Sequence, residues 1–360
     1  MSISSKPADK LKVSGVILVD KPKGMTSQQV VSKVKYLFKS PNHDSKKAGH
    51  TGTLDPMATG LLPICMGEAT KFSHYQLDAD KSYQATILLG SQTDTGDAEG
   101  QIVAQAPIPK FDDALLDNVA QQFLGAQQQI PPMYSALKKD GKKLYEYARA
   151  GIEIERPPRD ITIKAIELKA VDDKQIQLMV TCTKGTYVRV LGEDIAKAMG
   201  TLGHLTALRR TQVGNFNIDD AIALSELEKV AFDDRQVQLM SVDACIDIKA
   251  ELTLTPEQCT RIHMGQRLNV FEQLTDDLKK YIVAEINSQS FTDKDEASDQ
   301  SIESDIDEND SFAKDETQGV QLLEPELPVD IRLINEKGEF LGLGAVSLNG
   351  RLQPKKLIQR

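Results

Sequence analysis

Residues 49 to 60, GHTGTLDPMATG, limit the folding of this chain more than any other stretch, because they have almost no helix or strand propensity. Glycines at 52 and 60 permit backbone angles that other residues avoid, and Pro56 fixes its own φ. The stretch therefore predicts a shaped loop. It holds one carboxylate, Asp55, which makes this residue a candidate for catalysis. An Asp before Pro is also a common turn former, so a purely structural role stays open.

The TGTL part of this loop also occurs in the DKTGTL signature of aspartyl-phosphate transport ATPases. Here Gly49 takes the place of the acid and His50 that of the lysine, so the nucleophile of that chemistry is missing. The chain also lacks an apolar run of about 18 residues and a signal-peptide pattern at its start. We therefore exclude a transport ATPase, and expect a cytoplasmic protein without a membrane span.

A chain of 360 residues, 40% of them hydrophobic, is long enough for two globular domains. Its four cysteines form no C-x-x-C pair, and His263 alone near Cys259 is too little for a zinc site. We expect buried free thiols and no metal. The sequence also has no G-x-G-x-x-G or P-loop spacing, so no cofactor is expected.

The net charge of −10 is spread unevenly along the chain. Residues 291–316 hold eleven acidic residues and two lysines, whereas residues 1–50 hold ten lysines and three acidic residues. The lysine-rich start is consistent with a face that meets phosphates, and equally with an ordinary solvated surface. Charge alone leaves both readings open.

The first elements read as strand, loop and helix. Val16 to Val19 predict a buried strand, and a Lys-Pro-Lys-Gly turn follows. Thr26 and Gln29 have the spacing of a capping box, and the apolar residues after them recur with helical period.

Two later segments alternate with the period of a strand, Tyr83 to Leu89 and Ile176 to Cys182. The second is interrupted at Gly185, where we expect a bulge, and TYVRV then predicts that the strand resumes. On this reading, Tyr187 and Arg189 lie on the same face of that strand.

Residues 131–159 form a basic segment between these strands that is interleaved with tyrosines. Such a segment suits unpaired RNA, whose bases stack on rings while cations meet phosphates. An amphipathic surface helix over Leu144 to Arg149 is the alternative, and both stay open.

Near residue 246 the pattern changes to a shorter β-rich module, in which EKG and LNG are hairpin-turn signals. Residues 287–321 interrupt this module with Ser, Asp and Glu and few apolar residues. Because such a tract cannot offset its ordering entropy by burial, we expect it to be disordered.

Six blocks together resemble the bacterial TruB family of tRNA pseudouridine synthases, in order and spacing over residues 14–216: GVILVDKPKGMTS, AGHTGTLDPMATGLLPICMGEATK, KSYQATILLGSQTDTGDAEG, IPPMYSALKKDGKKLYEYARAG, CTKGTYVRVL and HLTALRRTQVG. The resemblance implies an α+β catalytic domain over 1–245 around a mixed, mostly antiparallel sheet. It further implies a small β-rich, PUA-like RNA-binding domain over 246–360. The implied activity is isomerisation of the uridine at tRNA position 55, in the T arm; that this number equals Asp55 is a coincidence.

The resemblance also implies the site, residue by residue. Asp55 falls on the catalytic aspartate, with Tyr83 and Arg189 as further catalytic residues. Tyr83 also falls among the substrate-binding positions, with His50, Tyr187 and Leu208. A lone histidine is more often structural, and that reading of His50 stays open.

The implied chemistry suits these residue types. Breaking the bond from uracil N1 to the sugar, turning the uracil and joining its C5 to the sugar changes no oxidation state, so no cofactor or metal is required. The reaction needs a carboxylate as nucleophile or electrostatic partner, which Asp55 provides, whichever atom it attacks. A guanidinium such as Arg189 keeps that carboxylate charged and can grip it with two hydrogen bonds. A uridine in a stem-loop must also flip out of its stack to reach Asp55.

A noncatalytic RNA-binding or RNA-remodelling protein of the same fold is the alternative function. A guide-RNA-dependent synthase is a third, but the basic insertion over 131–159 is similar to that of stand-alone bacterial enzymes. We therefore expect tRNA as the partner, no guide RNA and a monomer.

Overall fold

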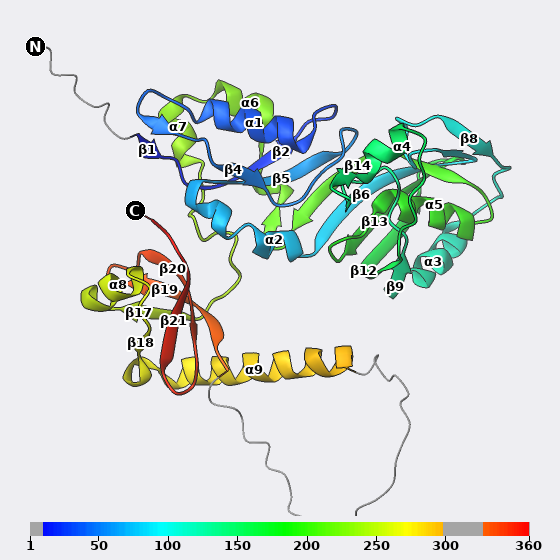
Figure 1. The fold of residues 1–360 in the computed structure, drawn as a ribbon. Coiled ribbons are helices and arrows are strands. Elements are labelled where there is room, and N and C mark those ends of the chain that lie inside the picture. The colour runs from blue at the N-terminus through cyan, green and yellow to red at the C-terminus, as the bar shows by residue number, and fades with distance from the viewer. Residues whose placement is uncertain (1–9, 298–326, 360) are drawn as a thin grey trace, which may run out of the picture. The chain divides into compact units, whose positions relative to one another are not determined.

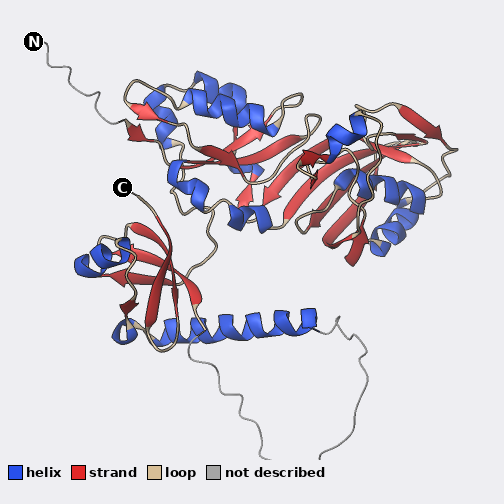
Figure 2. Cartoon of the chain, in the orientation of Figure 1, coloured by secondary structure: helices blue, strands red, loops and turns tan. Residues whose placement is uncertain are grey.

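The computed structural model describes residues 10–297 and 327–359. The chain divides into two compact units, Met1–Ile246 and Asp247–Arg360. Both contain helices and a β-sheet (Figure 2).

A ten-stranded mixed sheet forms the centre of the first unit (Figure 1). β5 and β14 pair in parallel, as do β16 and β2, and the other neighbours are antiparallel, as the fold prediction requires. The order along the sheet is β16 (Ile222–Ala223), β2 (Gly15–Lys21), β5 (Thr59–Met66), β14 (Gly203–Val213), β6 (Lys81–Leu89), β13 (Gln175–Cys182), β12 (Arg159–Ala170) and β9 (Gly125–Gln129), with β4 (Ala48–His50) on β5 and β15 (Phe216–Asn217) on β14.

Short helices flank this sheet, and the first carries the predicted capping box. In α1 (Ser27–Leu37), the Thr26 hydroxyl accepts from the backbone of Gln29, whose side chain accepts from the backbone of Thr26. α3 (Asp113–Gln122) contacts β12, and α5 (Val188–Ala198) contacts β14. The remaining elements of this unit are α2 (His74–Asp78), α4 (Leu144–Arg149), α6 (Leu224–Lys229), α7 (Phe232–Val237), the 3-10 turns Gly67–Lys71 and Ile218–Asp220, and the strands β1 (Leu11–Lys12), β3 (His43–Asp44), β7 (Ser91–Thr93), β8 (Ile102–Gln105), β10 (Lys138–Lys139) and β11 (Lys142–Lys143).

Two apolar clusters stabilise the first unit. One joins the inward face of β13 to α3 and α5, and the alternate residues predicted to point inward are all buried there: Ile176, Leu178, Val180 and Cys182. The other packs α1 and α6 against β2 and β5. All four cysteines are free thiols; three are buried as expected, and Cys259 is half-buried.

Within its described residues, the second unit contains a five-stranded sheet with two helices. Its hairpins turn at the predicted EKG and LNG positions. The sheet order is β17 (Glu251–Leu254), β19 (Val329–Asn335), β20 (Phe340–Val346), β21 (Arg351–Leu357) and β18 (Leu268–Asn269); the other elements are α8 (Pro256–His263), the 3-10 turn Phe271–Gln273 and α9 (Asp276–Ala297).

The prediction of disorder from residue 287 is wrong at its start, because α9 continues through Ala297. Ile282 and Ile286 on this helix are buried in the core of the second unit. Once such a docked turn exists, each further residue extends the helix at little cost, with no core contact required. Residues 298–321 of the predicted tract lie outside the described residues. Within residues 10–297 and 327–359, the helices are all too short or too polar to cross a bilayer.

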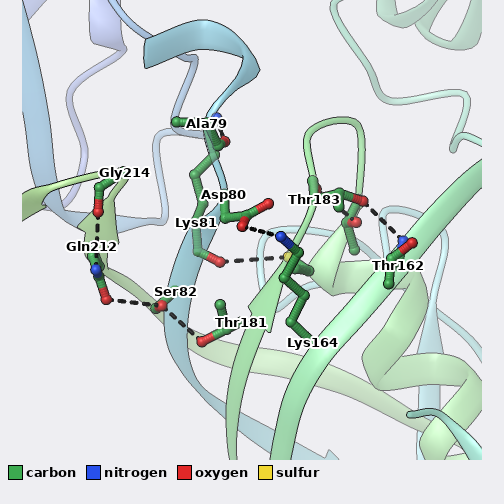
Figure 3. A network of polar contacts seen from close by, with 12 residues as sticks. Ala79, Asp80, Lys81, Ser82, Thr162, Lys164, Thr181, Thr183, Gln212 and Gly214 are labelled. Carbon is green, nitrogen blue, oxygen red and sulfur yellow. Dashed lines mark hydrogen bonds and ion pairs between the residues drawn. The ribbon is translucent and has the colours of Figure 1, made fainter. Parts of the chain in front are cut away.

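A buried lysine holds α2 to the central sheet. Lys81, at the start of β6, donates from Nζ to the carbonyl oxygens of Gln76, Leu77 and Ala79, at 3.3, 2.9 and 2.5 Å. Figure 3 shows this lysine beside Ala79. Burial lowers the pKa of Lys81 to about 8. The end of α2 is therefore held by a lysine that loses its proton at a lower pH than a solvated lysine does.

Lys81 should make stability rise at alkaline pH. Below pH 8 the lysine is charged in both states, but between pH 8 and its ordinary value of 10.5 the unfolded chain holds a proton that the folded protein has lost. Because the unfolded state then binds more protons, the free energy of unfolding increases with pH, by up to about 1.4 kcal/mol per unit. In urea unfolding from pH 7 to 10, Lys81→Met should lose this increase relative to wild type. Parallel pH profiles would contradict the prediction.

Gly60 allows the close approach of β5 to β14. Its φ is +103°, and a Cβ at this position would overlap the carbonyl oxygen of Arg210 and lie 2.7 Å from the Arg210 nitrogen. Gly125 has a similar φ of +99°, but a Cβ there would meet nothing within 4 Å. Substitutions at both glycines therefore carry the cost of a positive φ, but only a substitution at Gly60 also carries the cost of overlap with β14.

Gly60→Ala should destabilise the protein far more than Gly125→Ala. Both substitutions carry the left-handed penalty of about 1–2 kcal/mol, but only the first also pushes β14 away from β5. We expect Gly60→Ala to lower the free energy of unfolding by more than about 3 kcal/mol, as backbone overlap in a core does. Thermal melting and urea unfolding measure both variants. Equal losses would show that the contact with Arg210 is unimportant.

Candidate active site

The loop between β4 and β5 carries Asp55 and is tied to the first residue of α1 and to the turn before that helix. Ser27 is central, since its Oγ accepts from the Leu54 amide at 2.8 Å and lies 3.0 Å from the Leu54 carbonyl oxygen. Gly24 donates to the Pro56 carbonyl at 2.7 Å. Gly52 adopts φ +136°, so the predicted shaped loop is confirmed. The Asp55 side chain, fixed at this backbone, remains 40% exposed.

Arg189 is the cation that faces Asp55. Its side chain is only 5% exposed, and its Nε lies 3.0 Å from Asp55 Oδ2. The terminal nitrogens donate elsewhere, to the carbonyl oxygens of Thr95 at 2.6 Å and Tyr134 at 2.7 Å. Nη1 also lies 3.6 Å from Oδ2 of Asp97, which is itself buried.

The expected grip on Asp55 by two parallel hydrogen bonds is therefore wrong. The guanidinium is shared between two carboxylates and two backbone carbonyls, which together satisfy a buried cation. This sharing fixes the plane of the Arg189 group before any substrate arrives. Asp55 consequently meets a cation whose position is set by the protein.

Arg189 lies on a helix, so the prediction of a resumed strand after Gly185 is also wrong. β13 ends at Cys182, and α5 begins at Val188, with Tyr187 as its N-cap residue. The Gln129 side chain accepts from the Tyr187 amide at 2.8 Å and donates to its carbonyl at 3.2 Å, which stabilises the helix start. The buried residues that give this segment its helical spacing are Val188, Leu191 and Ile195.

Two buried cations support the loop that carries Asp55, and neither was predicted from the sequence. Lys21, at the end of β2, donates from Nζ to the Ala58 carbonyl at 2.6 Å. Burial lowers its pKa to about 8, although the negative charge of Asp55 opposes this shift. Arg210, on β14, is 1% exposed and donates to the carbonyls of Leu61 at 2.9 Å and Gly52 at 3.1 Å. Both cations thus hold the loop through its backbone.

Tyr83 lies across from Arg210, on the neighbouring strand β6. Burial is the main cause that raises the pKa of the Tyr83 phenol, and a hydrogen bond to Arg210 partly opposes it. The phenol therefore stays protonated at neutral pH and offers a proton rather than a base. The same cause, burial, raises the pKa of Tyr187.

The structure gathers most of the expected site residues around one cleft of about 340 Å³. His50 is not among its lining residues; its Nδ1 accepts from the Gly52 amide at 3.3 Å, within the turn that precedes Asp55. Burial lowers the pKa of His50, so its ring is predominantly neutral at neutral pH. The expected residues that line the cleft are Asp55, Tyr83, Tyr187, Arg189 and Leu208.

Polar contacts between strand ends support one wall of the cleft (Figure 3). Thr183 Oγ1 accepts from the Thr162 amide at 2.9 Å, and the Ser82 and Thr181 hydroxyls lie 2.8 Å apart. An ion pair of 2.5 Å joins Lys164 to Asp80 across the same end of the sheet. The Thr183 contact fixes the start of the segment between β13 and α5, which contributes residues 183–188 to the cleft.

The basic segment 131–159 also contributes residues to the cleft. It contains the hairpin of β10 and β11 followed by α4, whose bounds match the predicted helix Leu144–Arg149. The Lys143 ammonium and the Arg149 guanidinium lie 5.4 and 5.3 Å from the centroid of the Tyr145 ring. Residues 135–137 line the cleft, and the Tyr145 amide donates to the Ser135 carbonyl at 3.2 Å, so these two cation–π contacts lie near it.

Family models match most of the chain. Residues 41–188 match the TruB family pseudouridylate synthase (N terminal domain), residues 189–247 match the tRNA pseudouridylate synthase B C-terminal domain, and residues 318–358 match the pseudouridine synthase II TruB, C-terminal model.

Curated relatives extend over the full length. The chain is 73% identical to tRNA pseudouridine synthase B of Psychrobacter cryohalolentis, with 100% of both chains covered. It is 72% identical to the enzyme of the same name from Psychrobacter arcticus, over 99% of this chain and 97% of the relative. The enzyme of that name from Aromatoleum aromaticum is 49% identical, over 71% and 81%.

Solved structures share the fold at low identity. An H/ACA RNP bound to a substrate RNA containing 2'-deoxyuridine matches with a TM-score of 0.60 and 18% identity, over 96% of this chain and 85% of that one. The archaeal box H/ACA sRNP Nop10-Cbf5 complex matches with a TM-score of 0.58 and 18% identity, over 95% and 85%. The family models and the relatives at 72–73% identity lead to one conclusion: the chain belongs to the TruB family of pseudouridylate synthases and is an isomerase.

Proposed function

We propose that this protein converts uridine to pseudouridine in tRNA, at position 55 of the T arm, with Asp55 as the nucleophile. One observation carries the proposal, the half-exposed Asp55 carboxylate held 3.0 Å from the buried guanidinium of Arg189. The names of the relatives support tRNA as the substrate. The choice of position 55 comes from the six sequence blocks.

The ion pair keeps Asp55 reactive when the cleft closes over a uridine. Burying a carboxylate beside an apolar base favours its protonated form, which cannot attack the sugar or the base. The adjacent Arg189 opposes this effect, because its charge favours the ionised carboxylate. Nε pairs with Oδ2 of Asp55, and the other oxygen attacks the reacting carbon.

The other cleft residues hold the detached uracil and move its proton. The ring of Tyr83 packs against the base. Its phenol relays protons in the last step, in which C5 loses its proton after bonding to the sugar and the released N1 gains one. Tyr187 and Leu208 bound the pocket in which the uracil turns. His50 lies outside the lining of the cleft, so its contact with the substrate is at the space that the flipped base vacates. Its hydrogen bond with the Gly52 amide supports the loop that presents Asp55.

The substrate uridine enters this cleft by flipping out of a T stem-loop. The lysines of β10 and β11 meet the phosphates, and Tyr145 stacks on an unpaired base. Residues 131–159 thus serve as an RNA-binding insertion in the catalytic domain, residues 1–245, and residues 246–360 serve as a PUA-like RNA-binding domain. The reaction needs no cofactor or metal, because it changes no oxidation state.

One assay separates this function from its alternatives. Purified protein is incubated alone with unmodified tRNA, and pseudouridine is mapped by base-specific chemical modification. Formation at position 55 supports the proposal. Binding without product would favour a noncatalytic RNA-binding protein, and activity only after addition of a second RNA would favour a guided synthase.

Asp55→Asn should abolish pseudouridine formation and leave tRNA affinity within a few-fold. The amide keeps the shape of the carboxylate but loses its charge and nucleophilicity. Single-turnover assays should give a rate constant at least roughly 100-fold below wild type. A rate above about one per cent of wild type would refute the nucleophilic role.

Arg189→Lys should also be severely impaired, although the charge is kept. A lysine ammonium cannot reach Asp55, Asp97 and the carbonyls of Thr95 and Tyr134 at once, so Asp55 loses its fixed partner. We expect kcat to fall by about two orders of magnitude with KM within a few-fold, and a melting temperature within several degrees of wild type. Near-normal turnover would show that the arginine only supports the helix start.

A further inference from the structure

A second, basic groove lies in the first unit, at the C-terminal end of α1. It has a volume of about 800 Å³ and is formed by α1, the loop that follows it, α6 and α7, which lie side by side in Figure 1. We call it the α1 groove. The lining residues that carry the argument are Lys10, Lys33, Tyr36, Lys39, Glu228 and Arg235.

The α1 groove has an excess of positive charge. Its lining residues include four cationic side chains and one carboxylate, that of Glu228. Glu228 pairs with Lys33 at 3.2 Å. Arg235 donates to the Leu37 carbonyl at 2.6 Å, so its guanidinium is fixed at the end of α1. Lys10 donates from Nζ to the Ser40 carbonyl at 3.2 Å. A cation bound only to carbonyl oxygens keeps its full charge for an anionic ligand.

The packed elements also carry charged groups outside the lining. Asp233 and Asp234 on α7 are exposed, and Glu226 on α6 pairs with Lys229 at 2.8 Å. Lys35 adds a further cation on α1. These exposed acids limit the reach of the positive field to the groove itself, so a ligand must enter the groove to benefit from it.

Tyr36 gives the groove an aromatic face. Its side chain is 72% exposed, the highest value among the aromatic residues at this surface. A tyrosine so exposed gains nothing from the core, and it lies among the lysines on the same helix. Lysines around an exposed ring match the chemistry of RNA, whose phosphates need cations and whose bases stack on aromatic faces.

The groove is connected to the catalytic loop through α1. Ser27, at the start of this helix, makes hydrogen bonds with Leu54, next to Asp55. Tyr36 lies nine residues further along, which corresponds to about 14 Å of helix. A nucleotide bound in the cleft does not reach Tyr36 over this distance. Another part of the same folded RNA does.

We propose that the α1 groove binds the sugar–phosphate backbone of the tRNA at a site outside the T stem-loop, with Tyr36 stacked on an unpaired base. The proposal rests on tRNA being the substrate. An acidic protein segment would use the lysines but leave the tyrosine without a π-faced partner.

The test compares two RNAs and three variants. Full-length unmodified tRNA and an isolated T stem-loop are titrated into the full chain at several salt concentrations. Lys10→Gln/Lys39→Gln removes two groove cations, and Tyr36→Ala removes the ring. Lys169→Gln/Lys197→Gln is the matched control, because it removes two exposed lysines from β12 and α5. Those elements lie at the opposite end of the first unit from α1 (Figure 1).

The groove cations should matter for full-length tRNA only. With Lys10→Gln/Lys39→Gln, its Kd should rise at least fivefold at low salt, and the slope of log K against log salt should fall by about one to two. With Tyr36→Ala, Kd should rise about fivefold or more with the slope unchanged, since stacking releases no counterions. Both variants and the control should bind the stem-loop as wild type does.

The outcomes separate this proposal from the proposed function. The α1 groove is not a tRNA site outside the T stem-loop if the groove variants bind full-length tRNA as the control does. The same holds if they lose as much affinity for the stem-loop as for full-length tRNA. Pseudouridine formation in the stem-loop is measured in parallel and should stay at the wild-type rate in both groove variants. Its absence in wild type would refute the proposed function while the binding comparison still decides on the groove.

Discussion

The pairing of Arg189 with Asp55 is the interaction on which the site depends. A guanidinium that is 5% exposed is tolerable only because two carboxylates and two carbonyls surround it. These groups come from three segments of the first unit: the loop with Asp55, the turn with Thr95 and Asp97, and the segment with Tyr134. Asp55 itself is held by backbone contacts to α1, and Arg189 by the start of α5. Helix, loop and sheet must therefore all be in place before the carboxylate has its partner.

The sequence predicted the regular parts of this fold well. Strict alternation over Ile176 to Cys182 placed a strand and its buried face correctly, and Thr26 with Gln29 marked the start of α1. The segment after Gly185 was misread because alternation over five residues also fits the first turn of a helix, and the buried Leu191 and Ile195 lay beyond that window. The end of α9 was missed because helix propagation does not require apolar residues.

The sequence indicated most of the residues that gather in the cleft, but not the buried side chains that support them. A carboxylate in a glycine-rich loop is visible as a pattern, but Lys21 and Arg210 look like ordinary charged residues at the ends of apolar runs. Their burial follows from the loop that folds over them, where they donate to the Ala58 and Gly52 carbonyls. Only the tertiary structure shows that their partners are backbone carbonyl oxygens of the loop rather than acidic side chains.

The parallel pairing of β5 with β14 has a consequence for how the enzyme is assembled. Gly60 lies opposite Arg210, so this pairing joins segments 150 residues apart in the chain. Contacts between such distant segments form only after the loop entropy between them has been paid, which makes them slow. A nascent chain thus carries Asp55 long before it has the strand that completes the site. Catalytic competence arises late, as a property of the finished domain rather than of any fragment.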